Sequence, residues 1–456
     1  MASVAPPQHD STALERFFGV RAAGSSVRTE VIAGITTFLT AMYIIVVNPG
    51  ILAQAGVPFA SALTATVIVS FLGSCAMGLY ARNPVLVAPG MGMNALFAYV
   101  MVHVGKMPWQ TALGCVFWAG LIFTVLAVFN ARKLVMDAIP ANLRHAVSCG
   151  IGLFISLIGL VNAKFVVGDP VTIVRSASLN PVVITFLIGL AVTTVLVARR
   201  ITGALMLGIV FTTLIAIPIG RLWGDGTAYW PAAIATKTLV NWGGFFAPPD
   251  FSALGQLDLI GSLKVAYWPF IFVMLFTSFF DALSTFLAIA EAGKLYDENG
   301  DPRRIRQSMM VDAFTALLSA PLGTSPANAY IESAAGISAG GRTGLVAVVA
   351  GLCFLPFLFL SPLLSLVPAI ATAPALVLVG VFMMESVTLI HWHRFDEAIP
   401  AFLAMILIPL TYSITDGVAY GFLSYVVIKT CTGRIKEIKP AMWIIAAFSA
   451  LLLAQL

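Results

Sequence analysis

Long apolar runs alternate with short polar stretches along almost the whole chain. The runs recur from Val31 to Leu456, and each is about 16 to 22 residues long, close to the roughly 20 residues that a helix needs to cross a bilayer. They lack the strict two-residue alternation of barrel strands. The pattern therefore predicts fourteen membrane-spanning helical segments, at residues 29–48, 60–80, 85–103, 108–129, 145–163, 181–198, 202–220, 264–289, 307–321, 325–339, 343–361, 363–384, 398–413 and 416–430.

The last apolar stretch, AMWIIAAFSALLLAQL at 441–456, admits two interpretations. It is a further short span if 398–413 and 416–430 are separate helices. It is the fourteenth span if 398–430 forms one broken element.

Composition agrees with this pattern. Of the 456 residues, 59% are hydrophobic and only 10% are charged, and the mean hydropathy is +0.97. Soluble globular proteins carry about 25% charged residues. The chain is therefore expected to be an all-α integral membrane protein whose surroundings are the lipid bilayer. Its net charge of +5 is distributed over the loops, and no nucleic-acid partner is expected.

The basic residues predict the orientation in the membrane. If the N-terminus is cytoplasmic, most of them face the cytoplasm, including Arg82, Arg144, Arg199, Arg303 and Arg342. The opposite side then keeps only a few, among them Lys106, Lys164, Arg175, Arg221 and Lys237. This asymmetry obeys the positive-inside rule. We expect a multi-pass protein of the inner (plasma) membrane.

Two of the predicted spans are interrupted by helix-breaking residues. The third contains LVAPGMGMNALFAYVM (86–101), and the tenth lies within LGTSPANAYIESAAGISAGGRTG (322–344). A single break of this kind is commonly a packing kink. A pair at corresponding positions of two halves points to a binding site near the bilayer midplane of a transporter, because unwound backbone is tolerated only where protein or a polar ligand satisfies it.

The spacing of the breaks indicates an inverted repeat. They lie seven spans apart, and an odd offset turns the second half upside down relative to the first. DAIPANLRHAVSCGIGLFISLIGL (137–160) and SLVPAIATAPALVLVGVFMMESV (365–387) form a second, weaker internal match.

Three polar residues inside the spans need a function or a partner. Asn94 and Glu332 follow the two breaks, and Asp281 interrupts the eighth span. A carboxylate at the bilayer centre costs at least about 2.5–3.5 kcal/mol, so both acids are expected to line a pathway. The alternative is a buried structural hydrogen bond to a neighbouring Ser or Thr. We expect residues 86–93 to be partly unwound and a helix to begin near Asn94, with residues 325–331 and Glu332 as the inverted counterpart.

Other polar residues carry less weight. Thr36, Thr37, Thr40 and Tyr43 in the first span are close enough to reach the site, but the favoured interpretation is packing, since hydroxyls often bond helix carbonyls. Asn48, which precedes Pro49, is interpreted as the end of that span. The HWH motif at 391–393 is expected to be an ordinary loop rather than a metal site, and no cofactor is expected.

Longer motifs resemble a known family. LERFFGVRAAGSSVRTEVIAGITTFLTAMYIIVVNP, APGMGMNALFAY and YIESAAGISAGGRTG resemble the AzgA-like purine permeases of the nucleobase–cation symporter-2 group, and the similarity runs from Leu14 to about Lys429. The resemblance implies the uracil-permease fold, with two inverted seven-segment repeats and a short strand before a half-helix in spans three and ten.

The resemblance also implies a division into two domains. After an N-terminal cytoplasmic segment at 1–28, the core domain takes residues 29–129 (spans 1–4) and 264–361 (spans 8–11). The gate domain takes residues 130–263 (spans 5–7 and the following loop) and 362–456 (spans 12–14 and the C-terminus).

Site residues follow from the family's motifs by position. The purine-contacting asparagine and the glycine before it correspond to Asn94 and Gly92, the span-ten glutamate corresponds to Glu332, and Tyr330 is expected beside it. In span eight the second aspartate corresponds to Asp281, but Ser278 stands where the family usually has another acid. Ser278 can form a hydrogen bond but cannot carry a proton.

The function implied is secondary active import of purine bases: guanine, hypoxanthine, adenine or xanthine. Protons are the expected coupling ion, Glu332 and Asp281 the expected carriers, and movement of the core against the gate (an elevator) the expected mechanism. A homodimer is an open possibility. One alternative is anion transport of the sulfate-permease type on the same fold. A membrane enzyme or receptor is the other, but the sequence contains no nucleophile–base pair, metal constellation or phosphate-binding loop.

Overall fold

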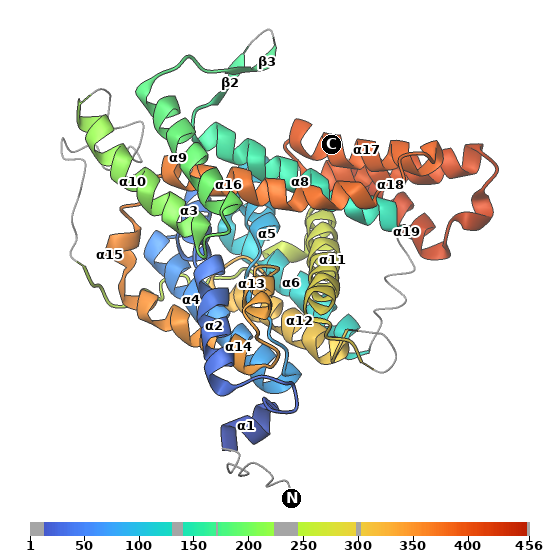
Figure 1. The fold of residues 1–456 in the computed structure, drawn as a ribbon. Helices are drawn as coiled ribbons and strands as arrows, with labels where there is room; N and C mark the ends of the chain where they lie inside the picture. The colour runs from blue at the N-terminus through green and yellow to red at the C-terminus, as the bar shows by residue number, and fades with distance from the viewer. Residues whose placement is uncertain (1–12, 130–139, 170–171, 223–244, 298–301, 454–456) are drawn as a thin grey trace, which may run out of the picture.

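The computed structural model of the chain describes residues 13–129, 140–169, 172–222, 245–297 and 302–453. Helices make up almost all of it, and they pack around two short strand pairs (Figure 1). The prediction of a largely helical membrane fold is confirmed.

The described residues of the first half form seven segments. In chain order these are α2 (Val27–Ala41) with α3 (Ile44–Gln54); α4 (Phe59–Ala76) with the π-helical η1 (Met77–Ala81); strand β1 (Val87–Pro89) with α5 (Met91–Ala95) and the π-helical η2 (Leu96–Val104); α6 (Trp109–Val128); α8 (Ala141–Asn162); α9 (Pro181–Ala198); and α10 (Ala204–Leu222).

The second half repeats this plan. Its segments are α11 (Trp268–Gly293); α12 (Ile305–Leu322); strand β4 (Ala327–Ala329) with α13 (Ser333–Ser338); α14 (Leu345–Phe354) with η7 (Leu355–Phe359); α16 (Ala369–Met383) with η8 (Met384–Leu389); α17 (Phe395–Leu410); and α18 (Ile414–Cys431). Each predicted span therefore corresponds to one of these segments.

The remaining described elements are short or peripheral: α1 (Ala13–Phe18), the hairpin of β2 (Val166–Asp169) and β3 (Ile173–Ser176), the turns η5 (Gly261–Leu263) and η6 (Val265–Tyr267), α15 (Ser361–Leu364), η9 (Ile435–Glu437) and α19 (Pro440–Leu453). Because α17 and α18 are separate helices, α19 follows the fourteenth segment as a further apolar helix. Residues 454–456 of the predicted terminal stretch lie outside the described residues.

Helix ends follow local chemistry. Pro58, Pro108, Pro140 and Pro368 each lie immediately before a span, where the missing proline N–H costs no helical hydrogen bond. At the other end of α12, Gly323 has φ of 90°, a left-handed conformation that glycine adopts without strain.

Among the described residues, seven helices are long and apolar enough to cross a membrane alone. Three further apolar helices, Met91–Val104, Ala204–Ala216 and Leu345–Phe359, are shorter. The first of these is short because β1 takes up the beginning of its span. The interruption at 86–101 therefore replaces helix with strand rather than bending a continuous helix.

The segments pack in two groups. In one, α12 packs on α6, α14 on α2 and α4, and α13 on α2. In the other, α8 packs on α16 and α17, α17 on α18, and α10 on α9 and α16. Figure 1 shows α8, α17 and α18 lying across one end of the bundle that contains α2, α4, α11 and α12.

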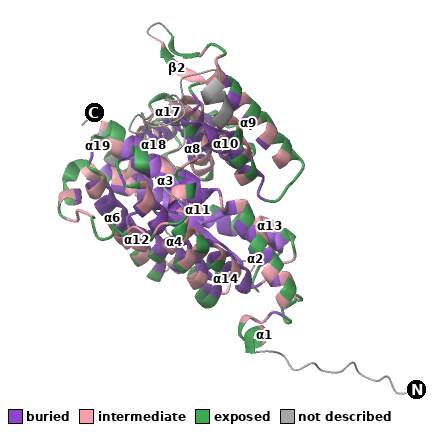
Figure 2. Cartoon of the chain, turned by 90° about the vertical axis from the view of Figure 1, so that its left-hand side faces the viewer, coloured by how far each residue is buried: buried purple, intermediate pink, exposed green. Residues whose placement is uncertain are grey.

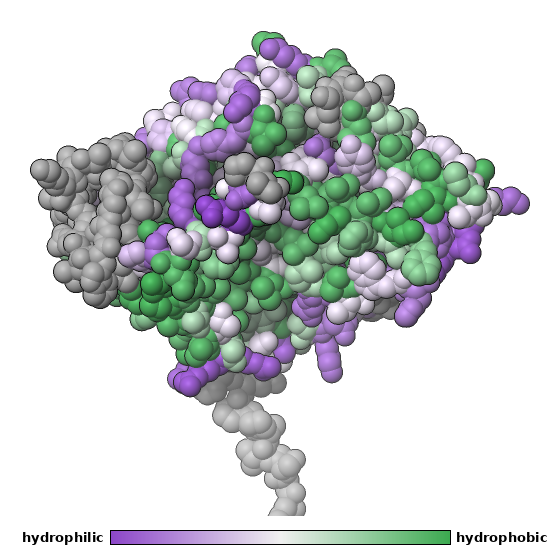
Figure 3. All heavy atoms as spheres, turned by 90° about the horizontal axis from the view of Figure 1, so that it is seen from above, coloured by the Kyte–Doolittle hydropathy of each residue, from purple (hydrophilic) through white to green (hydrophobic). Residues whose placement is uncertain are grey.

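The surface is as apolar as a lipid-facing protein requires. Large side chains such as Ile188, Val195 and Leu214 on α9 and α10 are exposed, and buried residues gather around α3, α4 and α11 (Figure 2). In Figure 3, hydrophobic side chains form broad continuous patches with hydrophilic residues toward the rim. Patches of this extent mark contact with another apolar phase, and here that phase is the bilayer.

Candidate functional site

The two interrupted spans meet in an antiparallel strand pair. Ala88 of β1 lies opposite Asn328 of β4. The Gly90 N–H donates to the Pro326 carbonyl and the Tyr330 N–H donates to the Leu86 carbonyl, both over 2.9 Å. This pairing satisfies backbone groups that hydrocarbon cannot. It also aims the helices that follow, α5 and α13, away from a shared centre.

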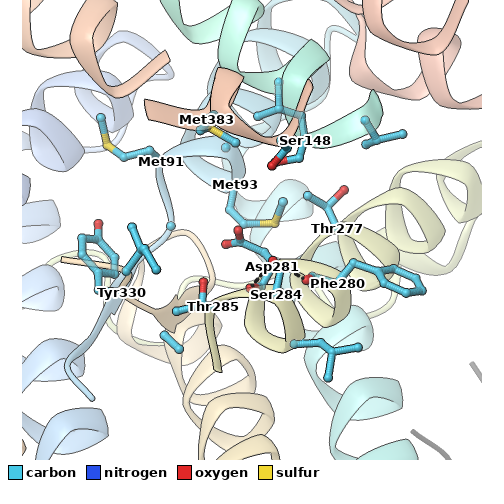
Figure 4. A pocket seen from close by; sticks show the side chains of 18 of the residues that line it. Met91, Met93, Ser148, Thr277, Phe280, Asp281, Ser284, Thr285, Tyr330 and Met383 are labelled. Atoms are coloured by element: carbon cyan, nitrogen blue, oxygen red, sulfur yellow. Dashed lines mark hydrogen bonds between the residues drawn. The ribbon is translucent and has the colours of Figure 1, made fainter. Parts of the chain in front are cut away.

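A cavity of about 320 Å³ opens beside this strand pair, within the size range of small-molecule sites. It is bounded by the two breaks, by α11, and by α8 and the α16–η8 segment. The site residues Gly92, Asp281, Tyr330 and Glu332 all line it. In Figure 4, Asp281 lies between Tyr330 and Phe280, with Met93 and Thr277 on its upper side.

Glu332 lies immediately before α13, at the position where a half-helix presents unpaired N–H groups. Its Oε1 accepts a 2.7 Å hydrogen bond from the Tyr43 hydroxyl. The alternative interpretation, a buried structural hydrogen bond, predicted a Ser or Thr partner for Glu332. The structure shows a tyrosine from the first span instead. Tyr43 also lines the cavity, so its interpretation as a packing residue alone is wrong.

Asp281 lies in the middle of α11 and faces the cavity. Its Oδ2 accepts a 3.1 Å hydrogen bond from Asn328 Nδ2 on β4. The other end of that amide, Asn328 Oδ1, has no hydrogen-bond partner in the described part of the chain. The carboxyl is therefore held by the tenth span while part of it stays open to the cavity.

Two predicted site residues do not line the cavity. Asn94 is fully buried, and Ser325 Oγ lies 3.0 Å from its Oδ1. The Ser278 hydroxyl lies 3.3 Å from Met93 Sδ and is covered by it. The helix after β1 begins at Met91, three residues earlier than expected. Asn94 is consequently turned away from the cavity toward Ser325, and Gly92 and Met93 face the cavity.

Ser325 connects Asn94 to a second buried amide. Its hydroxyl also lies 3.2 Å from Asn48 Oδ1, and Asn48 Nδ2 donates to Thr66 and Thr324. Asn48 lies inside α3 and is fully buried, so its interpretation as the end of the first span is wrong. Its hydrogen bonds connect α3 to α4 and to the residues before β4.

Aromatic side chains flank the acids. Phe276 and Phe280 line the cavity from α11, and Tyr330 lines it from the tenth span. The Tyr330 hydroxyl donates to the Pro89 carbonyl over 2.5 Å, which fixes the ring against β1. Flat apolar faces on both sides of a hydrogen-bonding group suit a planar heterocycle.

Two basic residues lie in the site that were not predicted there from the sequence. Arg144 and His145 of α8 line the cavity, and the Arg144 guanidinium lies 5.2 Å from the centre of the Phe280 ring. Their signal in the sequence is LRHA (143–146), just inside a predicted span. The positive-inside rule had assigned Arg144 only to a cytoplasmic boundary.

Asp312, whose carboxyl group is also buried, was not singled out from the sequence. Asp312 of α12 is fully buried, and neither of its carboxyl oxygens has a hydrogen-bond partner among the described residues. It does not line the cavity.

The glycine-rich motif at 340–344 serves packing. Glu30 of α2 is fully buried and accepts hydrogen bonds from the N–H groups of Arg342 and Thr343 and from the Thr343 hydroxyl, over 2.6 to 3.0 Å. A Cβ on Gly344 would lie 2.1 Å from the Gly78 carbonyl oxygen. The motif therefore anchors the loop before α14 rather than contacting the cavity.

A group of three carboxylates has a geometry that could hold a cation: Asp396, Glu397 and Glu437. The position is already taken by the ammonium of Lys429, whose Nζ lies 2.6, 3.3 and 2.5 Å from their oxygens. The predicted loop at 391–393 lies nearby, where Asn142 Oδ1 bonds the N–H and the ring of His391. These groups belong to the packing of α8, α17 and α18.

Known proteins have sequences similar to this chain over most of its length. The profile of a permease family matches residues 28–419. The adenine permease AdeP of Escherichia coli K12 is 39% identical over 434 residues, covering 95% of this chain and 94% of that protein. The guanine/hypoxanthine permease PbuO of Bacillus subtilis 168 is 39% identical over 445 residues, covering 96% and 99%.

A solved structure shows the same fold. The transmembrane domain of the cyanobacterial bicarbonate transporter BicA superposes with a TM-score of 0.64 at 16% sequence identity, covering 86% of this chain and 97% of that domain. At that identity the likeness concerns the fold alone.

Proposed function

The chain belongs to this permease family, among the AzgA-like purine permeases, and on that premise we propose that it imports purine nucleobases by proton symport. It is a transport protein and not an enzyme, since its relatives are permeases. The observation that carries the proposal is the cavity itself, in which Asp281 and Glu332 stand beside aromatic rings and unwound backbone.

The chemistry of the cavity suits a purine. Purines are flat and carry N–H donors on their edges, and the carboxyl groups of Asp281 and Glu332 are available in the cavity as acceptors. Phe280 and Tyr330 offer ring faces. A buried site of this kind rejects analogues that leave its polar groups unpaired, by up to about 10⁴–10⁵. The substrate class is therefore guanine, hypoxanthine, adenine or xanthine.

Proton coupling rests on the same two acids. Glu332 and Asp281 are the carboxyl groups in the cavity lining. The Ser278 hydroxyl is directed toward Met93 and does not ionise near neutral pH, so it cannot carry a proton in this way. We assign Glu332 as the residue that both binds the purine and carries the proton. Asp281 assists through its bond to Asn328. Gly92 lets backbone approach the ligand closely, and Asn94 supports the site from behind rather than touching the purine.

The two helix groups support an elevator mechanism. The core (29–129 and 264–361) carries the strand pair and both acids, and the gate (130–263 and 362–456) contributes α8 and α16 to the cavity wall. Between the helices of the two groups, Asn162 of α8 donates a 3.4 Å hydrogen bond to the Tyr99 hydroxyl and Phe276 of α11 packs edge-on against Phe422 of α18. The segment 250–258 is hydrogen-bonded to Ser61, Thr64 and Thr111, so it would move with the core. We propose that the core slides along the gate with its site intact, in an inner membrane, with a cytoplasmic N-terminus and as a homodimer.

Anion transport is the second candidate. Arg144 and His145 in the cavity lining favour it. Two carboxyl groups in the same lining would repel an anion. Competition of purine uptake by sulfate or bicarbonate separates the two functions.

The test is uptake of labelled purines into permease-deficient cells, at several external pH values, with and without a protonophore. We expect accumulation that rises with external acidity and collapses with protonophore. Glu332→Gln should retain some binding but lose concentrative uptake, and Asp281→Asn should reduce uptake less completely. Glu291→Gln is the matched control, because Glu291 is exposed at the end of α11. Uptake that follows a sodium gradient and ignores the protonophore would refute proton coupling.

A further inference from the structure

Tyr43 stands at the break in the first span. The residues between α2 and α3 are Met42 and Tyr43, and the Tyr43 side chain is 1% exposed. Its hydroxyl reaches from the first span to Glu332 Oε1 in the tenth, over 2.7 Å. The contact joins residues 289 positions apart in the sequence.

Helix α2, which precedes Tyr43, is packed tightly against the tenth span. Helix α2 packs along the tenth span: a Cβ added to Gly336 would lie 2.0 Å from Thr37 Oγ1, and Glu30 holds the loop at 342–343. The Thr40 hydroxyl also lies 3.4 Å from the Glu332 carbonyl oxygen. The position of the Tyr43 hydroxyl relative to Glu332 is thus fixed over the whole length of α2.

The bond divides the carboxyl group into two unequal oxygens. Oε1 is occupied by Tyr43, so Oε2 is the atom left for a ligand N–H or for a proton. A hydrogen bond donated to a carboxylate stabilises its ionised form. A phenol hydroxyl can also turn and accept a bond, so Tyr43 remains a partner when Glu332 becomes protonated.

We propose that Tyr43 is a positioning residue for purine transport, which directs Glu332 Oε2 to the substrate and sets the pH range in which the carboxyl exchanges its proton. The inference rests on the proposed function. Other groups near Glu332 are accounted for: the Tyr330 hydroxyl bonds Pro89, Asp281 bonds Asn328, and Arg144 and His145 line the same cavity from α8.

The experiment compares Tyr43→Phe with wild type in the purine uptake assay, measuring KM and Vmax across external pH. Without the Tyr43 hydroxyl, Glu332 Oε2 is no longer directed at the substrate, so KM should rise several-fold. The ionised Glu332 carboxylate loses the hydrogen bond from Tyr43, so Glu332 should keep its proton to a higher pH. The decline of uptake with rising external pH should therefore occur at higher pH than in wild type. Tyr425→Phe is the matched control, a buried tyrosine of α18 outside the cavity lining; its KM and pH profile should match wild type.

A double-mutant comparison separates positioning from structural damage. If Tyr43 acts through Glu332, adding Tyr43→Phe to Glu332→Gln should change purine binding by the purified protein little beyond the single variant. A Tyr43→Phe protein that inserts normally and keeps the wild-type KM and pH profile would overturn the inference. So would fully additive effects in the double variant. Absence of purine uptake by wild type would instead overturn the proposed function.

Discussion

Asn328 donates a 3.1 Å hydrogen bond from Nδ2 to Asp281 Oδ2. The bond ties the acid in the middle of α11 to strand β4, so the eighth and tenth spans share one polar centre. Asn328 lies within SPANAY (325–330) and is 1% exposed. It was not among the predicted site residues, although it lies in the tenth span, four residues before Glu332.

Replacing Asn328 should remove the hydrogen bond that joins Asp281 to strand β4. Asn328→Ala removes the partner of Asp281, and a buried group left without a partner costs about 1–3 kcal/mol. We expect purine affinity to fall about tenfold or more, measured as KM in cells and as binding to the purified protein. Asn180→Ala is the control: it removes the cap of α9, which costs about 1 kcal/mol of stability, away from the cavity. Equal KM values in the two variants would contradict the assignment.

Gly92 of α5 lies in the cavity lining, close to α8. A Cβ there would lie 2.9 Å from Ile151 Cγ2 of α8. Gly92→Val should abolish purine uptake while the protein still inserts in the membrane, because the side chain fills the space that backbone leaves for the ligand.

Two variants test whether this effect is steric. Gly50→Ala introduces a methyl group where nothing lies within 4 Å and should transport as wild type does. Gly92→Ala combined with Ile151→Ala, which removes Cγ2, should recover part of the uptake lost by Gly92→Ala alone. Normal transport by Gly92→Val would place the site elsewhere.

Glu30 should matter for stability rather than for transport chemistry. In Glu30→Gln one carboxyl oxygen becomes an NH₂ group that faces N–H donors, so up to three hydrogen bonds at 342–343 are weakened. We expect a loss of about 1–3 kcal/mol in unfolding free energy, seen as a lower melting temperature in detergent. The exposed Glu291→Gln should melt as wild type does. A KM change without a melting change would contradict this role.

Acid should remove one stabilising contact outside the spans. The Lys429 ammonium, 2.5 Å away, holds the pKa of Glu437 below its ordinary value. A carboxyl with a lowered pKa stabilises the fold above its unfolded pKa of about 4.3, and that stabilisation is lost as pH falls through the lower folded pKa. Glu437→Gln should therefore melt below wild type near neutral pH, and the difference should shrink below about pH 4. A difference that is constant with pH would contradict the assignment.

The order of spans and both interruptions could be predicted because hydropathy and helix-breaking residues are local signals. Which side chains of the short helices face the cavity could not be predicted. Helix α5 begins at Met91 rather than near Asn94, and two residues of helix turn a side chain by about 200°, which is the difference between Gly92 in the cavity and Asn94 behind it.

Hydrogen bonds between residues remote in sequence could not be predicted either. Tyr43 was grouped with the threonines of its span, and for Thr36 that interpretation holds, since it bonds the Ile32 carbonyl. Nothing near Tyr43 in the sequence distinguishes it, because its partner lies in the other half of the chain. Asp281 and Glu332, by contrast, were predicted to line a cavity because the cost of a carboxyl within a bilayer is evident from its position alone.

The pairing of β1 with β4 bears on how such a chain could originate. A protein of one half only would carry a strand whose edge has no partner in the membrane, and hydrocarbon would leave its backbone groups unsatisfied. A second copy inserted upside down supplies that edge, because antiparallel strands of three residues complete each other. An ancestor half as long would therefore have been stable only as an antiparallel pair, and joining two copies in one chain would have made permanent an association that the strands already required.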